Sequence, residues 1–243
     1  DVKIGDGAFM KTIEDARELS NIMVSIGKAF NKEVSAFITS MDEPLGLAVG
    51  NRLEVKEVID TLSGNGPVDL VDLCTQIAGY MLYFAKKSNS VEEGVKLAED
   101  NLNNGKALAK FYEFVEAQGG KIEDLDDFIN VNEILSFKAK KTGYIKTIKA
   151  LNIGLASMKL GGGRETKEDS IDPMVGIMLN KKVGDYVNRD DVLCEIYANK
   201  KVNEDIYQLL EDAYEITAEK VEKTSIIKEI ISSWCNNIDL IYN

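Results

Sequence analysis

The first ten residues, Asp1-Val2-Lys3-Ile4-Gly5-Asp6-Gly7-Ala8-Phe9-Met10, decide how the fold is interpreted. Their pattern is typical of the end of a buried strand, a loop with two glycines, and a phenylalanine just before a helix. Open α/β sheets bind their ligands outside the carboxyl ends of the strands, where such loops lie. Because this pattern begins at residue 1 without an initiator methionine, we expect the chain to be the downstream part of a larger enzyme.

The composition is that of a globular protein large enough to bury a sizeable core. The chain has 243 residues, of which 44% are hydrophobic, and its formal net charge is −12. That charge argues against a nucleic-acid partner, because nucleic-acid phosphates need a basic surface. No apolar stretch approaches the roughly 20 residues of a membrane span, so we expect no membrane association.

The residues that most often carry nucleophilic or metal chemistry are scarce. Histidine is absent, which excludes a Ser-His-Asp triad, a Cys-His pair and a histidine metal site within this sequence. The cysteines are odd in number and far apart, at Cys74, Cys194 and Cys235. They match neither a disulfide framework nor a CxxC metal site, which favours a cytoplasmic location.

The first part of the chain, residues 1–130, alternates strand and helix patterns. Thr12 followed by Asp15 resembles a capping box and marks the start of a helix. Apolar residues then recur every three or four positions, which predicts one buried helix face: Ile13, Ala16, Leu19, Met23, Ile26 and Phe30. The short apolar run 34–38 is typical of a buried parallel strand. We therefore predict an α/β sheet domain.

A helical layer is predicted to pack on this sheet. A helix is expected from Asn51 to Leu62, another after Pro67, and a third that begins with the capping box of Ser90 and Glu93. A fourth runs over 106–118 and ends at two glycines. Nothing in 66–118 has a strand pattern.

The second part, residues 131–243, has a different character and predicts an α+β domain with a helical tail. Short strand patterns alternate with turns over 136–140, 144–147, 174–179 and 192–197. Helices are predicted over 148–159 and 203–212. The apolar spacing within 218–243 is that of a helix.

Six blocks in the same order give the chain a resemblance to the pyrimidine-nucleoside phosphorylase and thymidine phosphorylase family. The first is Asp1-Val-Lys-x-Gly-x-Gly-Ala-Phe-Met10, and together the blocks cover nearly the whole chain. The others are Met41-Asp-Glu-Pro-Leu-Gly-Leu-Ala-Val-Gly-Asn51 with Leu53-Glu-Val-Lys-Glu57, Ala117-Gln-Gly-Gly120, Lys141-Thr-Gly-Tyr144, Leu160-Gly-Gly-Gly-Arg164 and Val183-Gly-Asp185.

The resemblance implies phosphorolysis of a pyrimidine nucleoside by inorganic phosphate, which gives the free base and a pentose 1-phosphate. It places Phe9 against the pyrimidine and Lys3 near the same cleft. The family's phosphate loop and its other base contacts precede the strand that ends at Lys3, so we expect the 243-residue chain alone to be inactive. The family forms homodimers, which the resemblance extends to the complete protein.

The resemblance also implies a potassium ion beside a hinge. Its ligands would be main-chain carbonyls of Leu45 and Ala48 and the carboxylate of Glu57, together with groups outside this sequence. A hard monovalent cation prefers oxygen ligands, and a glycine-containing loop can turn carbonyls inward.

Each of these sites has a simpler alternative. Phe9 alone fits a hydrophobic staple for the following helix, and Lys3 and Glu57 fit solvated surface positions. The run Gly161-Gly162-Gly163-Arg164 lacks the ending of a P-loop and follows a helix, so it is better explained as a helix C-cap.

Three other functions stay open at this point. Two are enzymes on the same scaffold, an AMP phosphorylase and an anthranilate phosphoribosyltransferase, although the latter lacks a domain corresponding to 136–217. The third is a biotinyl-like carrier or binding module, because Ala156-Ser-Met-Lys159 resembles the Met-Lys of biotin carriers. A biotinylated lysine needs an exposed tight hairpin, whereas Lys159 follows a helical pattern.

Overall fold

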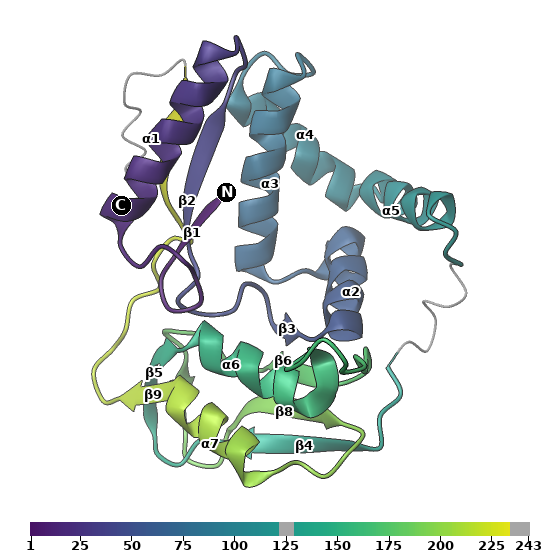
Figure 1. Cartoon of the computed structure of the whole chain (residues 1–243), viewed down its shortest axis with the longest axis vertical. Coiled ribbons are helices and arrows are strands. Elements are labelled where there is room, and N and C mark those ends of the chain that lie inside the picture. Colours follow the sequence, from purple (N-terminus) through teal and green to yellow (C-terminus); the bar gives the residue numbers. More distant parts are fainter. Residues whose placement is uncertain (122–128, 234–243) are drawn as a thin grey trace.

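The protein divides into an upper and a lower half in the computed structural model, which describes residues 1–121 and 129–233 (Figure 1). The upper half contains a three-stranded sheet with helices on both sides. The lower half contains two small sheets and two main helices. This arrangement confirms the predicted fold class, a mixed α/β sheet domain with a helical layer followed by an α+β part.

The upper sheet is buried on both faces. Strand β1 (Val2–Ile4) runs parallel to β2 (Ser35–Ser40), and β10 (Ile227–Ser232) lies antiparallel on the other side of β2. Side chains of β2 alternate between the two faces of the sheet. Ile38 packs with α1 (Ile13–Ala29) on one face, and Phe37 packs with Leu73 and Tyr80 on the other. The predicted parallel strand is thus confirmed, shifted by a residue or two.

Helix α1 begins where the sequence predicts. Thr12 is its N-cap, and the Thr12 side chain accepts a hydrogen bond from the Asp15 amide. The predicted buried face is wrong in part, because Met23, Ile26 and Phe30 are 51%, 55% and 74% exposed. The prediction is confirmed for Ala16, and the other buried positions of the helix are Ser20 and Val24. Ala16 packs against Val2 and Ile38 of the sheet.

The helical layer has the predicted order. Its members are α2 (Asn51–Asp60) with a π-helical turn (Thr61–Asn65), α3 (Val68–Phe84), α4 (Val91–Asn103) and α5 (Lys106–Ala117). Ser90 caps α4 by accepting from the Glu93 amide, as the capping box predicts. Helices α3 and α4 touch at two glycines, since a Cβ on Gly94 would lie 2.5 Å from the Gly79 carbonyl oxygen.

The lower half is built on two antiparallel sheets. Their strand orders are β3-β6-β8-β4 and β7-β5-β9. The strands are β3 (Ala48–Val49), β4 (Glu133–Lys138), β5 (Gly143–Ile148), β6 (Gly176–Leu179), β7 (Tyr186–Val187), β8 (Val192–Ala198) and β9 (Tyr214–Thr217). Helices α6 (Ala150–Ser157) and α7 (Glu204–Ala213) close a core of fully buried aliphatic side chains, among them Ile145, Ile153, Ile177, Ile196 and Leu210.

The chain crosses between the halves more than once. Strand β3 leaves the upper half to pair with β6, and β10 returns from the lower half to pair with β2. The helix predicted within 218–243 is therefore wrong over 227–232. The spacing of the pairs Ile226-Ile227 and Ile230-Ile231 is compatible with a helix or a strand. Pairing with the open edge of β2 favours the strand.

Some expectations lie outside the described residues. These are the acidic connection at 123–127 and the last ten residues, 234–243. The proposed domain division at residue 130 adjoins the first of these gaps and stays a prediction.

Candidate functional site

The loop that follows β1 is closed on itself and carries an exposed Phe9. The Gly5 amide donates to the Met10 carbonyl at 3.1 Å, and the Ala8 amide donates to the Gly5 carbonyl at 3.2 Å. Gly5 has a φ of +109°, which favours glycine. Inside this closed loop Phe9 is 100% exposed. The loop lies at the carboxyl end of β1, next to the end of the parallel strand β2, which is the usual ligand position in such sheets.

The exposure of Phe9 removes its alternative role. A hydrophobic staple packs against the first turns of its helix, whereas the Phe9 ring contacts nothing that shields it from solvent. Met10 packs against the α1 cluster instead, together with Ile13. Phe9 is thus an aromatic side chain held out from a closed loop.

Lys3 is more constrained than a solvated lysine. Its ammonium donates to Thr39 Oγ1 at 2.9 Å and pairs with the Asp1 carboxylate at 2.8 Å. Partial burial lowers the pKa of Lys3 from its ordinary value, and the nearby Cys74 raises it to a smaller extent. Lys3 is therefore not a freely solvated lysine, because it is bound to Asp1 and to Thr39, the residue opposite it on β2.

Glu57 reaches from α2 into the loop that joins β2 to β3. Its Oε1 accepts from the amides of Leu47 at 2.7 Å and Ala48 at 3.0 Å. Burial raises the pKa of Glu57, and these two hydrogen bonds oppose that rise. Glu57 is therefore a half-buried carboxylate that fixes the loop, and the solvated alternative is wrong here too.

The residues expected to bind potassium are only partly brought together. Glu57 contacts the Ala48 amide, while the Leu45 side chain packs against the cluster around Phe37. Glu57 Oε2 lies beside Gly46, where an added Cβ would be 2.3 Å away, and it receives no hydrogen bond from the described residues. A half-buried carboxylate oxygen in that position fits one ligand of a cation. Among the described residues, no three Cys, Asp or Glu side chains are placed to hold a metal by themselves.

Lys182 contacts the loop between β2 and β3, and the sequence did not identify this role. It comes from the β6–β7 connection in the lower half, and its side chain is 15% exposed. Its ammonium lies 2.9 Å from Asp69 Oδ2 and 3.5 Å from Glu43 Oε2. It also donates to the carbonyl oxygens of Pro44 and Gly46. The only sequence signal was its position just before the Val183-Gly-Asp185 block, which specifies no partner.

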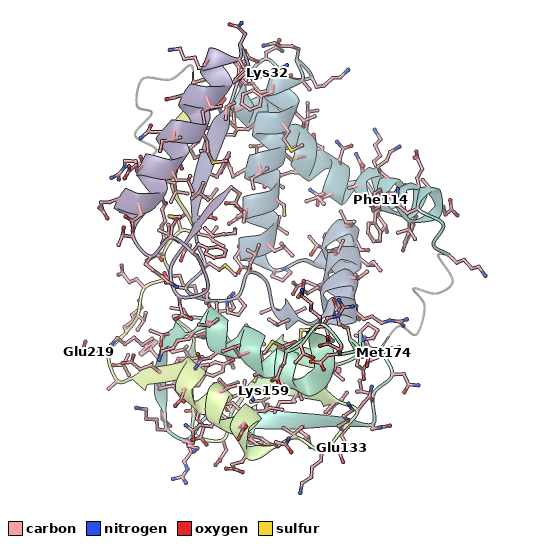
Figure 2. The ribbon with its side chains drawn as sticks, in the orientation of Figure 1. Lys32, Phe114, Glu133, Lys159, Met174 and Glu219 are labelled. Carbon is pink, nitrogen blue, oxygen red and sulfur yellow. The ribbon has the colours of Figure 1, made fainter. Side chains whose placement is uncertain are left out.

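The glycine run acts as the predicted helix end. Gly161 has a φ of +108° in the π-helical turn Met158–Gly162 that follows α6. Lys159 lies in the same turn, in the lower half of the molecule (Figure 2). Its ammonium is 3.8 Å from Glu165 and 3.7 Å from Asp205. Because Lys159 is at a helix end rather than in a tight hairpin, the structure gives no support for a biotin carrier.

The described thiols are poor candidates for chemistry. Burial raises the pKa of Cys194 to about 12, so this side chain stays protonated at neutral pH. Burial also raises the pKa of Cys74. Among the described residues, no helix is long and apolar enough to cross a bilayer.

Two family models match the chain, one in each half. The "Glycosyl transferase family, a/b domain" matches residues 1–108, which include the Phe9 loop and Glu57. The "Pyrimidine nucleoside phosphorylase C-terminal domain" matches residues 144–217, which include α6 and Lys182.

Curated relatives match nearly the whole chain. It is 44% identical to a pyrimidine-nucleoside phosphorylase of Staphylococcus haemolyticus over 233 residues, which is 95% of this chain and 54% of the relative. It is 43% identical to the pyrimidine-nucleoside phosphorylase of Geobacillus stearothermophilus over 235 residues, again 54% of the relative. The chain thus spans about half the length of the curated relatives it matches.

Proposed function

Since the chain belongs to the pyrimidine-nucleoside phosphorylase family, we propose that it forms part of an enzyme that cleaves pyrimidine nucleosides with inorganic phosphate. The main support is the exposure of Phe9, because a fully exposed aromatic ring near the carboxyl end of β1 is available to stack on a base. The match of residues 144–217 to the phosphorylase C-terminal domain favours this reaction over that of an anthranilate phosphoribosyltransferase.

The proposed reaction is a displacement at the anomeric carbon of the pentose. A phosphate oxygen forms the new bond to that carbon while the C–N bond to the base breaks, and the electron pair of that bond stays on the ring nitrogen of the base. The transition state has oxocarbenium character, as in glycoside hydrolysis. A stacked ring orients the base along the line of displacement, which lowers the entropic part of the barrier.

Lys3 has a secondary place in this proposal. Its ammonium already has two oxygen partners, Asp1 and Thr39. We assign it to holding the ends of β1 and β2 in register beneath the Phe9 loop, close to the position of a substrate oxygen.

A potassium ion is also part of the proposal. Glu57 Oε2 and the main-chain carbonyls of Leu45 and Ala48 would hold it, with further ligands from outside this chain. Such an ion supplies a fixed positive charge that stabilises the loop between the two halves of the molecule. Glu57 supports this assignment because its carboxylate is half-buried and already bonded to the loop.

The proposal includes a cytoplasmic homodimer that binds neither nucleic acid nor membranes. The net charge of −12 supports the absence of a nucleic-acid partner.

A chimera tests the proposed function. In the Geobacillus stearothermophilus relative, the segment that aligns with this chain is replaced by the 235 matching residues of this chain, and uridine phosphorolysis is assayed. We expect activity within about tenfold of the parent, because the relatives are 43% identical over this length. A cooperative thermal transition shows that the chimera is folded. A folded chimera without activity would contradict the proposal.

The same chimera tests the potassium site. Added KCl, compared with choline chloride at equal ionic strength, is expected to raise the melting temperature because a cation that binds only the folded state stabilises it. Glu57→Gln is expected to abolish this rise. Glu54→Gln is a matched control, since Glu54 also accepts a loop amide, from Gly50 at 3.1 Å. If KCl raised the melting temperature equally in the Glu57→Gln variant and in the unmodified chimera, Glu57 would not be a ligand of the ion.

A further inference from the structure

The first turn of α6 is capped by a residue far away in the sequence. The Leu151 amide donates to Asp6 Oδ2 at 3.0 Å, across a separation of 145 residues. The residue at the local N-cap position, Lys149, makes no side-chain capping hydrogen bond. Asp6 therefore fills the role of the missing N-cap, and its carboxylate lies where a helix favours negative charge.

The same place is held by further contacts. The Asp6 amide donates to Asp42 Oδ1 at 3.2 Å, and the Ala150 amide donates to the Asp42 carbonyl at 3.0 Å. The Gly7 amide donates to the Met41 carbonyl at 3.1 Å, and a Cβ on Gly7 would lie 3.2 Å from the Ala150 Cβ. We call this contact between the Phe9 loop, residues 41–42 and the start of α6 the α6 joint (Figure 1).

The α6 joint bears on the candidate site because Phe9 has no support of its own. The ring is 100% exposed, so only the backbone of its closed loop sets its direction. That loop is hydrogen-bonded through Asp6 to α6, which belongs to the region matched by the phosphorylase C-terminal domain. We propose that Asp6 is a positioning residue through which α6 of the C-terminal domain orients the Phe9 loop for the pyrimidine nucleoside. This inference rests on the proposed function.

Asp6→Ala tests the joint with two readouts. In the 243-residue chain, hydrogen exchange of peptides that cover 5–10 and 150–153 is expected to become about tenfold faster. In the chimera, the KM for uridine is expected to rise about three- to tenfold, with kcat and the KM for phosphate within twofold of the unmodified values. Asp6→Asn keeps an acceptor oxygen, so its exchange rates and its KM for uridine are expected to stay close to those of the unmodified protein. Glu14→Ala removes a neighbouring exposed acid and is expected to change neither.

The outcomes separate this inference from the proposed function. Unchanged exchange in the Asp6→Ala variant refutes the cap. Faster exchange with an unchanged KM for uridine, or with equal rises in both KM values, refutes the positioning role and leaves phosphorolysis intact. A folded chimera that is inactive with Asp6 present refutes the proposed function and the substrate role of Asp6 with it. The exchange readout, which needs no activity, still decides whether Asp6 caps α6.

Discussion

Phe9→Ala in the chimera is expected to raise the KM for uridine by about 5- to 150-fold. The range follows from the roughly 1–3 kcal/mol that stacking of a base on an aromatic ring contributes. Because the ring is fully exposed, its removal leaves no cavity, and the free energy of unfolding is expected to stay within about 0.5 kcal/mol of the unmodified value. Steady-state kinetics with uridine and with phosphate, each varied in turn, measures the effect.

Two variants make the Phe9 result specific. Phe9→Tyr keeps a ring of the same shape and is expected to keep the KM within about threefold. Phe114→Ala removes another exposed phenylalanine, 60% exposed on α5, and is expected to have no effect on the KM (Figure 2). An unchanged KM in Phe9→Ala would rule out stacking as the role of this residue.

Lys182→Ala is expected to destabilise the protein by about 2 kcal/mol. The substitution leaves the carboxylates of Asp69 and Glu43 without their shared cation, and breaking a buried ion pair costs roughly 3–5 kcal/mol. We expect a smaller loss because these carboxylates keep 28% and 30% exposure and regain some solvation. Urea unfolding of the chain, followed by circular dichroism, measures the loss.

The neighbouring lysine provides the control for Lys182. Lys181→Ala removes the same charge one residue earlier, where no salt bridge is formed within the described part of the chain, and is expected to cost less than about 0.5 kcal/mol. Equal losses in the two variants would show that Lys182 does not tie the β6–β7 connection to the loop before β3.

Local signals in the sequence predicted most of the helices and strands. Thr12 and Ser90 mark helix starts through a side chain that bonds an amide three residues later, and both bonds are formed. Gly119 and Gly161 mark helix ends, and both have a positive φ. These signals predict correctly because each depends only on a hydrogen bond or a backbone angle within a few neighbouring residues.

Predictions failed where a distant part of the chain decides the outcome. The isoleucines of β10 suit a helix or a strand, and the free edge of β2 selects the strand. Spacing alone did not show which apolar residues of α1 face the sheet, where Ala16 packs with Val2 and Ile38. The resemblance suggested Phe9 and Glu57 as site residues, but not Asp6 or Lys182. The partner of Asp6 is 145 residues away and those of Lys182 are 113 or more residues away, so no local pattern predicts these contacts.

Phosphate-dependent release of uracil from uridine by the folded chimera is the most direct test of the account. We propose that the chain supplies the stacking ring and the C-terminal domain of a phosphorolytic enzyme, and on this proposal release is predicted to require inorganic phosphate and to yield one ribose 1-phosphate per uracil. A folded chimera that releases no uracil, or releases it equally well without phosphate, would contradict that account.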